Sequence, residues 1–124
     1  MRTIYPVFRY TDPRAAIDWL GAAFGFRVHA AHEAPDGSVA HAELLFDDGM
    51  VMIGRRPDTA SPRVRLADDY AVYVAVDDVD AHHERARAAG AEVVRPPFDT
   101  DYGSRDYVAR DLEGNVWSFG TYRV

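Results

Sequence analysis

Residues 5–26 read YPVFRYTDPRAAIDWLGAAFGF, which is a strand-like segment, an aspartate with a proline, and a helical segment that stops at a glycine. The same order returns in residues 71–91, which read AVYVAVDDVDAHHERARAAGA, and the two stop glycines, Gly25 and Gly90, lie 65 residues apart. A glycine turn before an apolar strand segment, at Gly49, also recurs 65 residues later. Self-similarity at a fixed period indicates a repeated structural unit. The sequence therefore predicts an α+β fold in which one βαβββ unit occurs twice.

The elements of each unit follow from turn chemistry and side-chain periodicity. Asp12 and Pro13 supply a helix cap and a first-turn proline, and the apolar residues that follow recur at helical spacing. In the first unit we expect strands over residues 4–10, 26–33, 38–46 and 50–54, and a helix over 13–24. In the second we expect strands over 71–76, 91–95, 105–110 and 115–122, a helix over 79–89, and a proline-rich loop over 96–103. This organisation gives a single domain, 1–124, with module one at about 3–55, a linker at about 56–69 and module two at about 70–124.

The composition narrows both the partners and the chemistry. The chain has 124 residues with no cysteine and no lysine, which removes disulfides, thiolate metal sites, cysteine nucleophiles and Schiff-base catalysis. Its 20 acidic and 14 basic residues give a formal charge of −6, which disfavours nucleic acid and anionic membranes as partners. We find no apolar segment suited to a signal sequence or a bilayer span, so a cytoplasmic location is expected.

Five short motifs occur in order along the chain: Thr11-Asp12-Pro13, Ala23-Phe24-Gly25-Phe26, Val76-Asp77-Asp78-Val79-Asp80, Tyr102-Gly103-Ser104-Arg105 and Asp111-Leu112-Glu113-Gly114-Asn115. Together with the repeat they resemble the vicinal oxygen chelate superfamily, which contains glyoxalase I, fosfomycin-resistance enzymes, extradiol dioxygenases and bleomycin-resistance proteins. The resemblance implies paired βαβββ modules that each curl into a half-open cup around a cavity, with the helices outside. It also implies a homodimer, in which the modules pair either within one chain or by domain swapping.

The resemblance provides a test for metal binding, because metal-using members place ligands at set positions. One ligand, typically histidine, lies seven residues before the aspartate that opens each helix, and another, typically glutamate, lies in the last strand of each module. Those positions hold Tyr5, Met52, Ala71 and Ser118 here, with Tyr70 in place of Ala71 if Asp77 is the true equivalent. Catalytic divalent metals need about three or four histidine or carboxylate donors. The sequence therefore predicts that no metal cofactor is bound at these positions.

Other histidines and acids provide alternatives. His41 and Glu43 lie two apart on a predicted strand, so they share a face and are the remaining candidates for a metal pair. Glu43 is also the candidate general base, or a partner for Arg9. His29 and His32 are three apart and are expected on opposite faces. One of the two adjacent histidines of the second helix, His82 and His83, is expected to pack against the sheet.

The cup predicts a ligand site with an apolar and aromatic lining and a few polar anchors, the usual composition of a small-molecule pocket. Strand alternation sends the lining side chains inward: Tyr5, Val7, Arg9, Glu43, Met50, Met52, Tyr73 and Ser118. The loop after the second helix adds a rim of aromatic and basic side chains: Phe98, Tyr102, Arg105 and Tyr107. The alternative is that these side chains only fill the cup as core.

We therefore predict a metal-independent binding protein of the bleomycin-resistance type, which sequesters an aromatic, largely apolar or antibiotic-like small molecule in the cavity of a homodimer. No catalytic residue is assigned, apart from the candidate Glu43. Three alternatives remain open: a glyoxalase-like or dioxygenase-like metalloenzyme that uses His41 and Glu43, a metal-free isomerase or lyase that uses Glu43 or Tyr5, and a dimer that scaffolds another protein.

Overall fold

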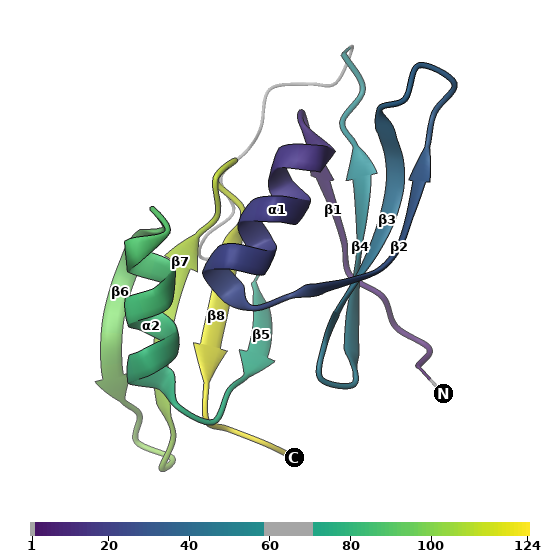
Figure 1. Cartoon of the computed structure of the whole chain (residues 1–124). Coiled ribbons are helices and arrows are strands. Elements are labelled where there is room, and N and C mark those ends of the chain that lie inside the picture. Colours follow the sequence, from purple (N-terminus) through teal and green to yellow (C-terminus); the bar gives the residue numbers. More distant parts are fainter. Residues whose placement is uncertain (1, 59–70) are drawn as a thin grey trace. The chain divides into compact units, whose positions relative to one another are not determined.

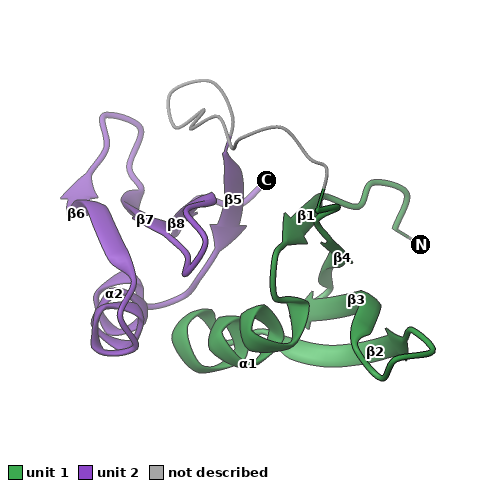
Figure 2. Ribbon diagram, turned by 90° about the horizontal axis from the view of Figure 1, so that it is seen from above, with its two compact units in different colours: residues 1–63 green, residues 64–124 purple. Residues whose placement is uncertain are grey.

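The computed structural model describes residues 2–58 and 71–124 and divides the chain into two compact units, Met1–Arg63 and Val64–Val124 (Figure 2). Most of the predicted linker, and Tyr70 directly after it, lie outside the described residues. None of the helices in the described part of the chain has the length and apolar character needed to cross a bilayer.

The first unit is a four-stranded sheet with one helix packed on it (Figure 1). Its elements are β1 (Val7–Tyr10), α1 (Pro13–Phe24), β2 (Arg27–Glu33), β3 (Val39–Phe46) and β4 (Gly49–Arg55). The strand order is β1-β4-β3-β2, with β1 parallel to β4 and the other pairs antiparallel. A strand, a helix and three antiparallel strands in succession make the predicted βαβββ unit.

The second unit repeats this topology. Its elements are β5 (Val72–Ala75), α2 (Val79–Ala88), β6 (Glu92–Asp99), β7 (Arg105–Arg110) and β8 (Val116–Gly120), in the sheet order β5-β8-β7-β6. The strand registers identify equivalent positions: Val7 pairs with Met52 as Tyr73 pairs with Ser118. The predicted α+β class with two βαβββ units is confirmed.

The helices begin and end where the sequence indicates. The Asp12 carboxylate accepts a hydrogen bond from the Ala15 backbone N at 3.1 Å, and Gly25 ends α1 with a φ of 90°. In α2 the corresponding bond runs from the Ala81 backbone N to Asp78 at 3.0 Å. Glycine adopts the left-handed conformation without a Cβ penalty, which explains the repeated glycine after each helix.

Each unit buries its core between the helix and one face of its sheet. In the first unit α1 packs on all four strands, and the core comprises Tyr10, Leu20, Phe24, Ala42, Leu44 and Ile53. In the second, α2 packs on β6 and β7, over Val79, Ala86, Tyr107, Ala109, Trp117 and Phe119. A fully buried large apolar side chain contributes about 1.5–3 kcal/mol. The opposite face of each sheet, which we call its open face, is the side turned away from the helix.

The main difference from the predicted elements lies in β6. This strand extends to Asp99 and so includes Pro96 and Pro97, which the sequence placed in a loop. Because β6 is an edge strand, the prolines leave no interior ladder bond unmade, and the pairing with β7 is irregular between Arg95 and Phe98. At the N-terminus, β1 begins at Val7 rather than at residue 4.

Candidate functional site

The open face of the second unit carries a buried carboxylate. Asp106 of β7 is only 5% exposed, although it lies on the face opposite the helix-covered Tyr107. Its Oδ1 accepts hydrogen bonds from Tyr73 Oη at 2.9 Å and from Ser104 Oγ at 3.1 Å, and Tyr102 Oη lies 3.5 Å from Oδ2. Three hydroxyl groups from β5 and from the β6–β7 turn therefore converge on one carboxylate.

Gly120 of β8 makes room for this arrangement. It is the cross-strand partner of Asp106, and a Cβ at this position would overlap both Asp106 Oδ1 and Tyr73 Oη. Because real Cβ atoms essentially never approach other atoms so closely, glycine is required for this hydrogen bond to form. The site thus depends on a missing side chain in β8 as well as on the polar groups of β5 and β7.

Three tyrosines line a hollow of about 380 Å³ on the same unit: Tyr73, Tyr102 and Tyr122. The rings of Tyr102 and Tyr122 stand perpendicular, with centroids 5.9 Å apart. Tyr73 Oη accepts a hydrogen bond from the Tyr122 backbone N at 3.0 Å, so one hydroxyl links the carboxylate to the C-terminal segment. Burial, and after it the hydrogen bond to Asp106, raises the pKa of the Tyr73 hydroxyl.

Tyr102 is placed by the turn between β6 and β7. The Thr100 backbone N donates to the Ser104 carbonyl at 2.8 Å, and the Ser104 backbone N donates to Thr100 Oγ1 at 3.1 Å. Gly103, with a φ of 88°, allows the chain to reverse. The turn is closed at its base, so the Tyr102 ring stands exposed beside Asp106.

The residues predicted from the sequence include some of those that meet here and not others. Tyr73, Tyr102 and Ser118 are predicted, and they lie on or beside this open face. Asp106, Ser104, Gly120 and Tyr122 are not predicted. The signal that identifies Asp106 is its register, because it lies two residues from Val108, the cross-strand partner of Ser118.

Two predicted ligand residues of β7, Arg105 and Tyr107, require correction, because a register shift of one residue turns every side chain to the other face. Arg105 forms ion pairs with Asp80 of α2 at 3.0 Å and with Asp99 at 3.1 Å. Tyr107 is fully buried under α2, with its Oη 2.5 Å from His82 Nδ1, and burial raises its pKa. The expectation that a histidine of this helix packs on the sheet is thus confirmed.

Phe98 lies in β6 directly opposite Asp106, in place of the predicted loop. The guanidinium carbon of Arg95 lies 3.4 Å from the centroid of the Phe98 ring. Such stacking holds a cation over the face of an aromatic ring. The Phe98 ring therefore already has a partner in Arg95.

The open face of the first unit brings together several of the predicted lining residues. Met52 of β4 lies between Val7 of β1 and Glu43 of β3 in the strand register. Met50 precedes Met52 by two residues and lies on the same face. The Arg9 guanidinium reaches over Gly54, where a Cβ would lie 3.0 Å from its Nη1. Tyr5 lies before β1, and its Oη donates to the Arg2 carbonyl at 2.9 Å.

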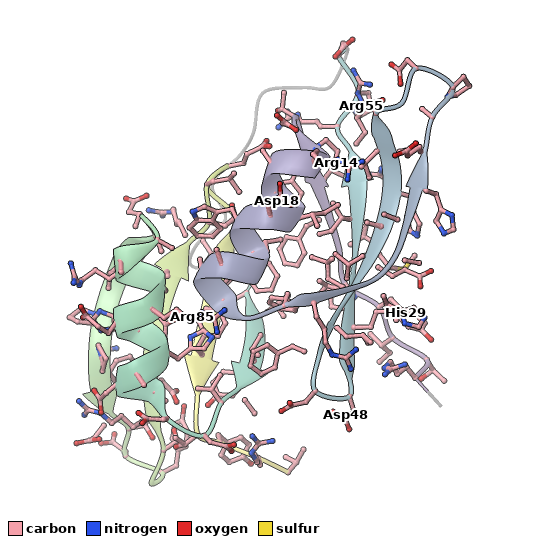
Figure 3. All side chains as sticks on the ribbon, in the orientation of Figure 1. Arg14, Asp18, His29, Asp48, Arg55 and Arg85 are labelled. Carbon is pink, nitrogen blue, oxygen red and sulfur yellow. The ribbon has the colours of Figure 1, made fainter. Side chains whose placement is uncertain are left out.

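Glu43 lies between two histidines. Its carboxylate oxygens are 4.0 Å from Nε2 of His29, which is labelled in Figure 3, and 3.9 Å from His41 Nε2. The rings of His32 and His41 stack with centroids 5.8 Å apart. The expectation that His29 and His32 face opposite sides is wrong. A register irregularity between Val28 and Ala30 adds His29 to β2 opposite Glu43, so His29 lies on the same face as His32.

The residues at the family's metal positions do not fit a divalent metal. Met52 and Ser118 occupy equivalent places in the two sheets, and with Tyr5 and Ala71 they offer a thioether, a hydroxyl, a phenol and a methyl group. Within residues 2–58 and 71–124, no group of three or more histidine and acidic side chains is arranged to hold a metal ion.

Comparison with known proteins agrees with this architecture. Residues 4–119 match the model of the Glyoxalase/Bleomycin resistance protein/Dioxygenase superfamily. An uncharacterized protein of Mycobacterium bovis is 34% identical over 117 residues, which cover 88% of this chain and 76% of that protein. The crystal structure of TioX from Micromonospora sp. ML1 is 40% identical, with a TM-score of 0.78 over 99% of this chain and 98% of that chain. A glyoxalase I mutant from Zea mays, 20% identical, has a TM-score of 0.75 over 99% of this chain and 45% of its own, and shares the fold.

Proposed function

Because this chain belongs to the Glyoxalase/Bleomycin resistance protein/Dioxygenase superfamily, as its motifs predicted, we propose that it is a metal-independent binding protein for an aromatic, largely apolar small molecule. The hollow lined by Tyr73, Tyr102 and Tyr122 carries this proposal. Its volume of about 380 Å³ falls within the range of small-molecule sites, which are lined mostly by apolar and aromatic groups with a few polar anchors. The ligand would stack on the rings and hydrogen-bond to their hydroxyls.

Binding without chemistry is the simplest role for these residues. Tyr73 and Ser104 donate hydrogen bonds from their hydroxyls to the buried carboxylate of Asp106, which fixes the position of both groups beside the hollow. The side chains at the family's metal positions are not donors for a divalent metal, the group that would supply Lewis-acid chemistry. We propose that the protein acts as a homodimer in the cytoplasm. It would protect the cell by holding its ligand in the site, so that less of the ligand is free.

The first test is calorimetric titration of the purified chain with a panel of planar aromatic molecules, alongside Tyr102→Leu. Base or ring stacking on an aromatic side chain contributes about 1–3 kcal/mol, so loss of this exposed ring should weaken binding at least about fivefold. Val124→Leu, an exposed change at the C-terminus, serves as the control. If Tyr102→Leu binds the aromatic molecules with the same affinity as the wild type, the hollow is not the binding site.

The second test separates binding from metal catalysis. The protein is purified without chelator or affinity metal, incubated with zinc, nickel, manganese or ferrous iron, desalted, and submitted to elemental analysis. We expect no stoichiometric metal. One metal per chain that is lost in His41→Ala or Glu43→Ala would instead support the metalloenzyme alternative and would contradict the proposal.

A second candidate function rests on Glu43. A carboxylate within about 4 Å of two imidazoles is a possible proton-transfer group for an isomerase or lyase. If the first unit acts in this way, ligands found by titration should be recovered chemically altered by the wild-type protein and intact from Glu43→Gln. Recovery of unaltered ligand from both proteins would dismiss catalysis at this carboxylate.

A further inference from the structure

We propose that the tyrosine hollow of the second unit is a cation site, which binds the ammonium, amidinium or ring-nitrogen cation of its ligand. This inference rests on the proposed binding function and names the chemical class of the ligand. It follows from two independent features of the same surface: an aromatic hollow, and a buried carboxylate behind it that forms no ion pair with a basic side chain of residues 2–58 or 71–124.

The first feature is the charge of Asp106. Acidic side chains are almost never so deeply buried unless they are paired, because removing a carboxylate from water is costly. The contacts of this carboxylate are the hydroxyls of Tyr73, Ser104 and Tyr102, all neutral groups. Among the ion pairs of the described residues, none includes Asp106. A bound cation would supply the missing positive charge.

The arginines of the second unit that bear on this region are engaged elsewhere. Arg105, the neighbour of Asp106, pairs with Asp80 and Asp99. Arg95 stacks on the ring of Phe98, and Arg110 pairs with Glu92 at 3.4 Å. Arg123, the neighbour of Tyr122, pairs with Asp77 at 2.9 Å. Within residues 71–124, each of these four arginines therefore has a partner other than Asp106.

The second feature is the aromatic lining itself. Tyr73, Tyr102 and Tyr122 surround the hollow, and the faces of tyrosine rings attract cations within about 6 Å of the ring centroid. Such contacts contribute about 0.5–1 kcal/mol when exposed and about 2 or more when desolvated. Hydrogen bonds polarise one another in chains, so phenols that donate to a carboxylate carry more electron density for a cation. Aromatic cages for quaternary ammonium groups use the same chemistry.

The equivalent position in the first unit lacks this combination. His41 pairs with Gly54 as Asp106 pairs with Gly120, and Val7 takes the place of Tyr73. The repeat thus places a histidine and an aliphatic side chain where the second unit has a carboxylate and a phenol. The cation site therefore belongs to the second unit and does not follow from the shared topology.

The test compares two probes that share one planar ring system, neutral quinoline and cationic N-methylquinolinium, by calorimetric titration of the full chain at neutral pH. We expect the wild type to prefer the cation by at least about tenfold. Asp106→Asn keeps the size and a carbonyl acceptor but removes the charge, and should reduce the preference to about threefold or less. Asp101→Asn is the matched control, because Asp101 is exposed and adjoins Tyr102, so the net charge changes equally while the preference should stay.

A further variant keeps the test decisive if Asp106→Asn does not fold. Tyr102 is 67% exposed, so Tyr102→Leu removes a ring without disturbing the core and should also reduce the preference for the cation. Equal binding of the two probes by the wild type would overturn the cation site and leave the aromatic binding function standing. Failure of both probes to bind would also overturn the cation site, and the aromatic panel would then decide the binding function separately.

Discussion

Replacing Gly120 of β8 by alanine should disrupt the hydrogen bond between Asp106 and Tyr73 and destabilise the protein. The new methyl group would approach Asp106 Oδ1 and Tyr73 Oη more closely than 3.0 Å, so the hydrogen bond between them could not keep its geometry. Overpacking costs about 1–3 kcal/mol and a lost hydrogen bond to a charged group about 1.5–3 kcal/mol, while the stiffer unfolded chain returns about 0.4–1 kcal/mol. We therefore expect Gly120→Ala to lower the free energy of unfolding by about 2–5 kcal/mol.

The repeat supplies the matched control, Gly54→Ala. Gly54 occupies the equivalent register position in the first unit, and its added Cβ would meet only the end of the Arg9 side chain, at 3.0 Å. A flexible guanidinium can move aside, so this variant should stay within about 1 kcal/mol of wild type. Urea unfolding followed by circular dichroism measures both. If Gly120→Ala is no less stable than Gly54→Ala, the inference that Asp106 packs closely against Gly120 of β8 is wrong.

Three further predictions concern the second unit. Burial raises the pKa of Tyr107, so the contribution of its neutral hydroxyl to stability is complete below the ordinary tyrosine pKa of about 10 and is lost as the pH rises above that value. The free energy of unfolding in urea should therefore decline above about pH 10, and it should decline less steeply in Tyr107→Phe. The hydrogen bond from Arg105 lowers the pKa of Asp80, so Arg105→Gln should raise that pKa in a carboxyl NMR titration. If Arg105→Gln also changed the affinity for the quinoline probes, Arg105 would belong to the ligand site after all. Asp111 accepts from the backbone N of Asn115 and from Trp117 Nε1, both at 3.0 Å, so Asp111→Ala should cost about 2–4 kcal/mol in urea; a loss below about 0.5 kcal/mol would show that these bonds add little.

The fold could be predicted because its signals are local and occur twice. Asp12 and Asp78 cap helices, and Gly25 and Gly90 follow them, so each copy checks the other. The length of β6 could not be predicted in the same way. Prolines indicate loops, and only the position of β6 at the edge of its sheet, a tertiary property, lets that strand continue through Pro96.

The site was harder to predict because it depends on strand register. In β7 the sequence RDYVAR places both charged and apolar side chains on each face, so alternation alone does not choose between Asp106 and Tyr107 as the outward residue. The choice is made by burial of Tyr107 under α2, a contact between distant segments. The irregularity near His29 in β2 leaves no mark in the sequence either, and it changes which histidines meet.

The two faces of each sheet carry different constraints on sequence change. The helix-covered face holds the fold, so its apolar residues can change only within narrow limits of volume. The open face contributes little to that packing, and positions such as His41 and Asp106, equivalent in register, already differ in chemistry. Selection can therefore alter recognition in one copy while the other keeps its surface and both keep their scaffold. A chain built in this way can acquire new ligands by substitutions on the open face of either unit, away from crowded positions such as Gly120, with less risk to folding than substitutions on the helix-covered face.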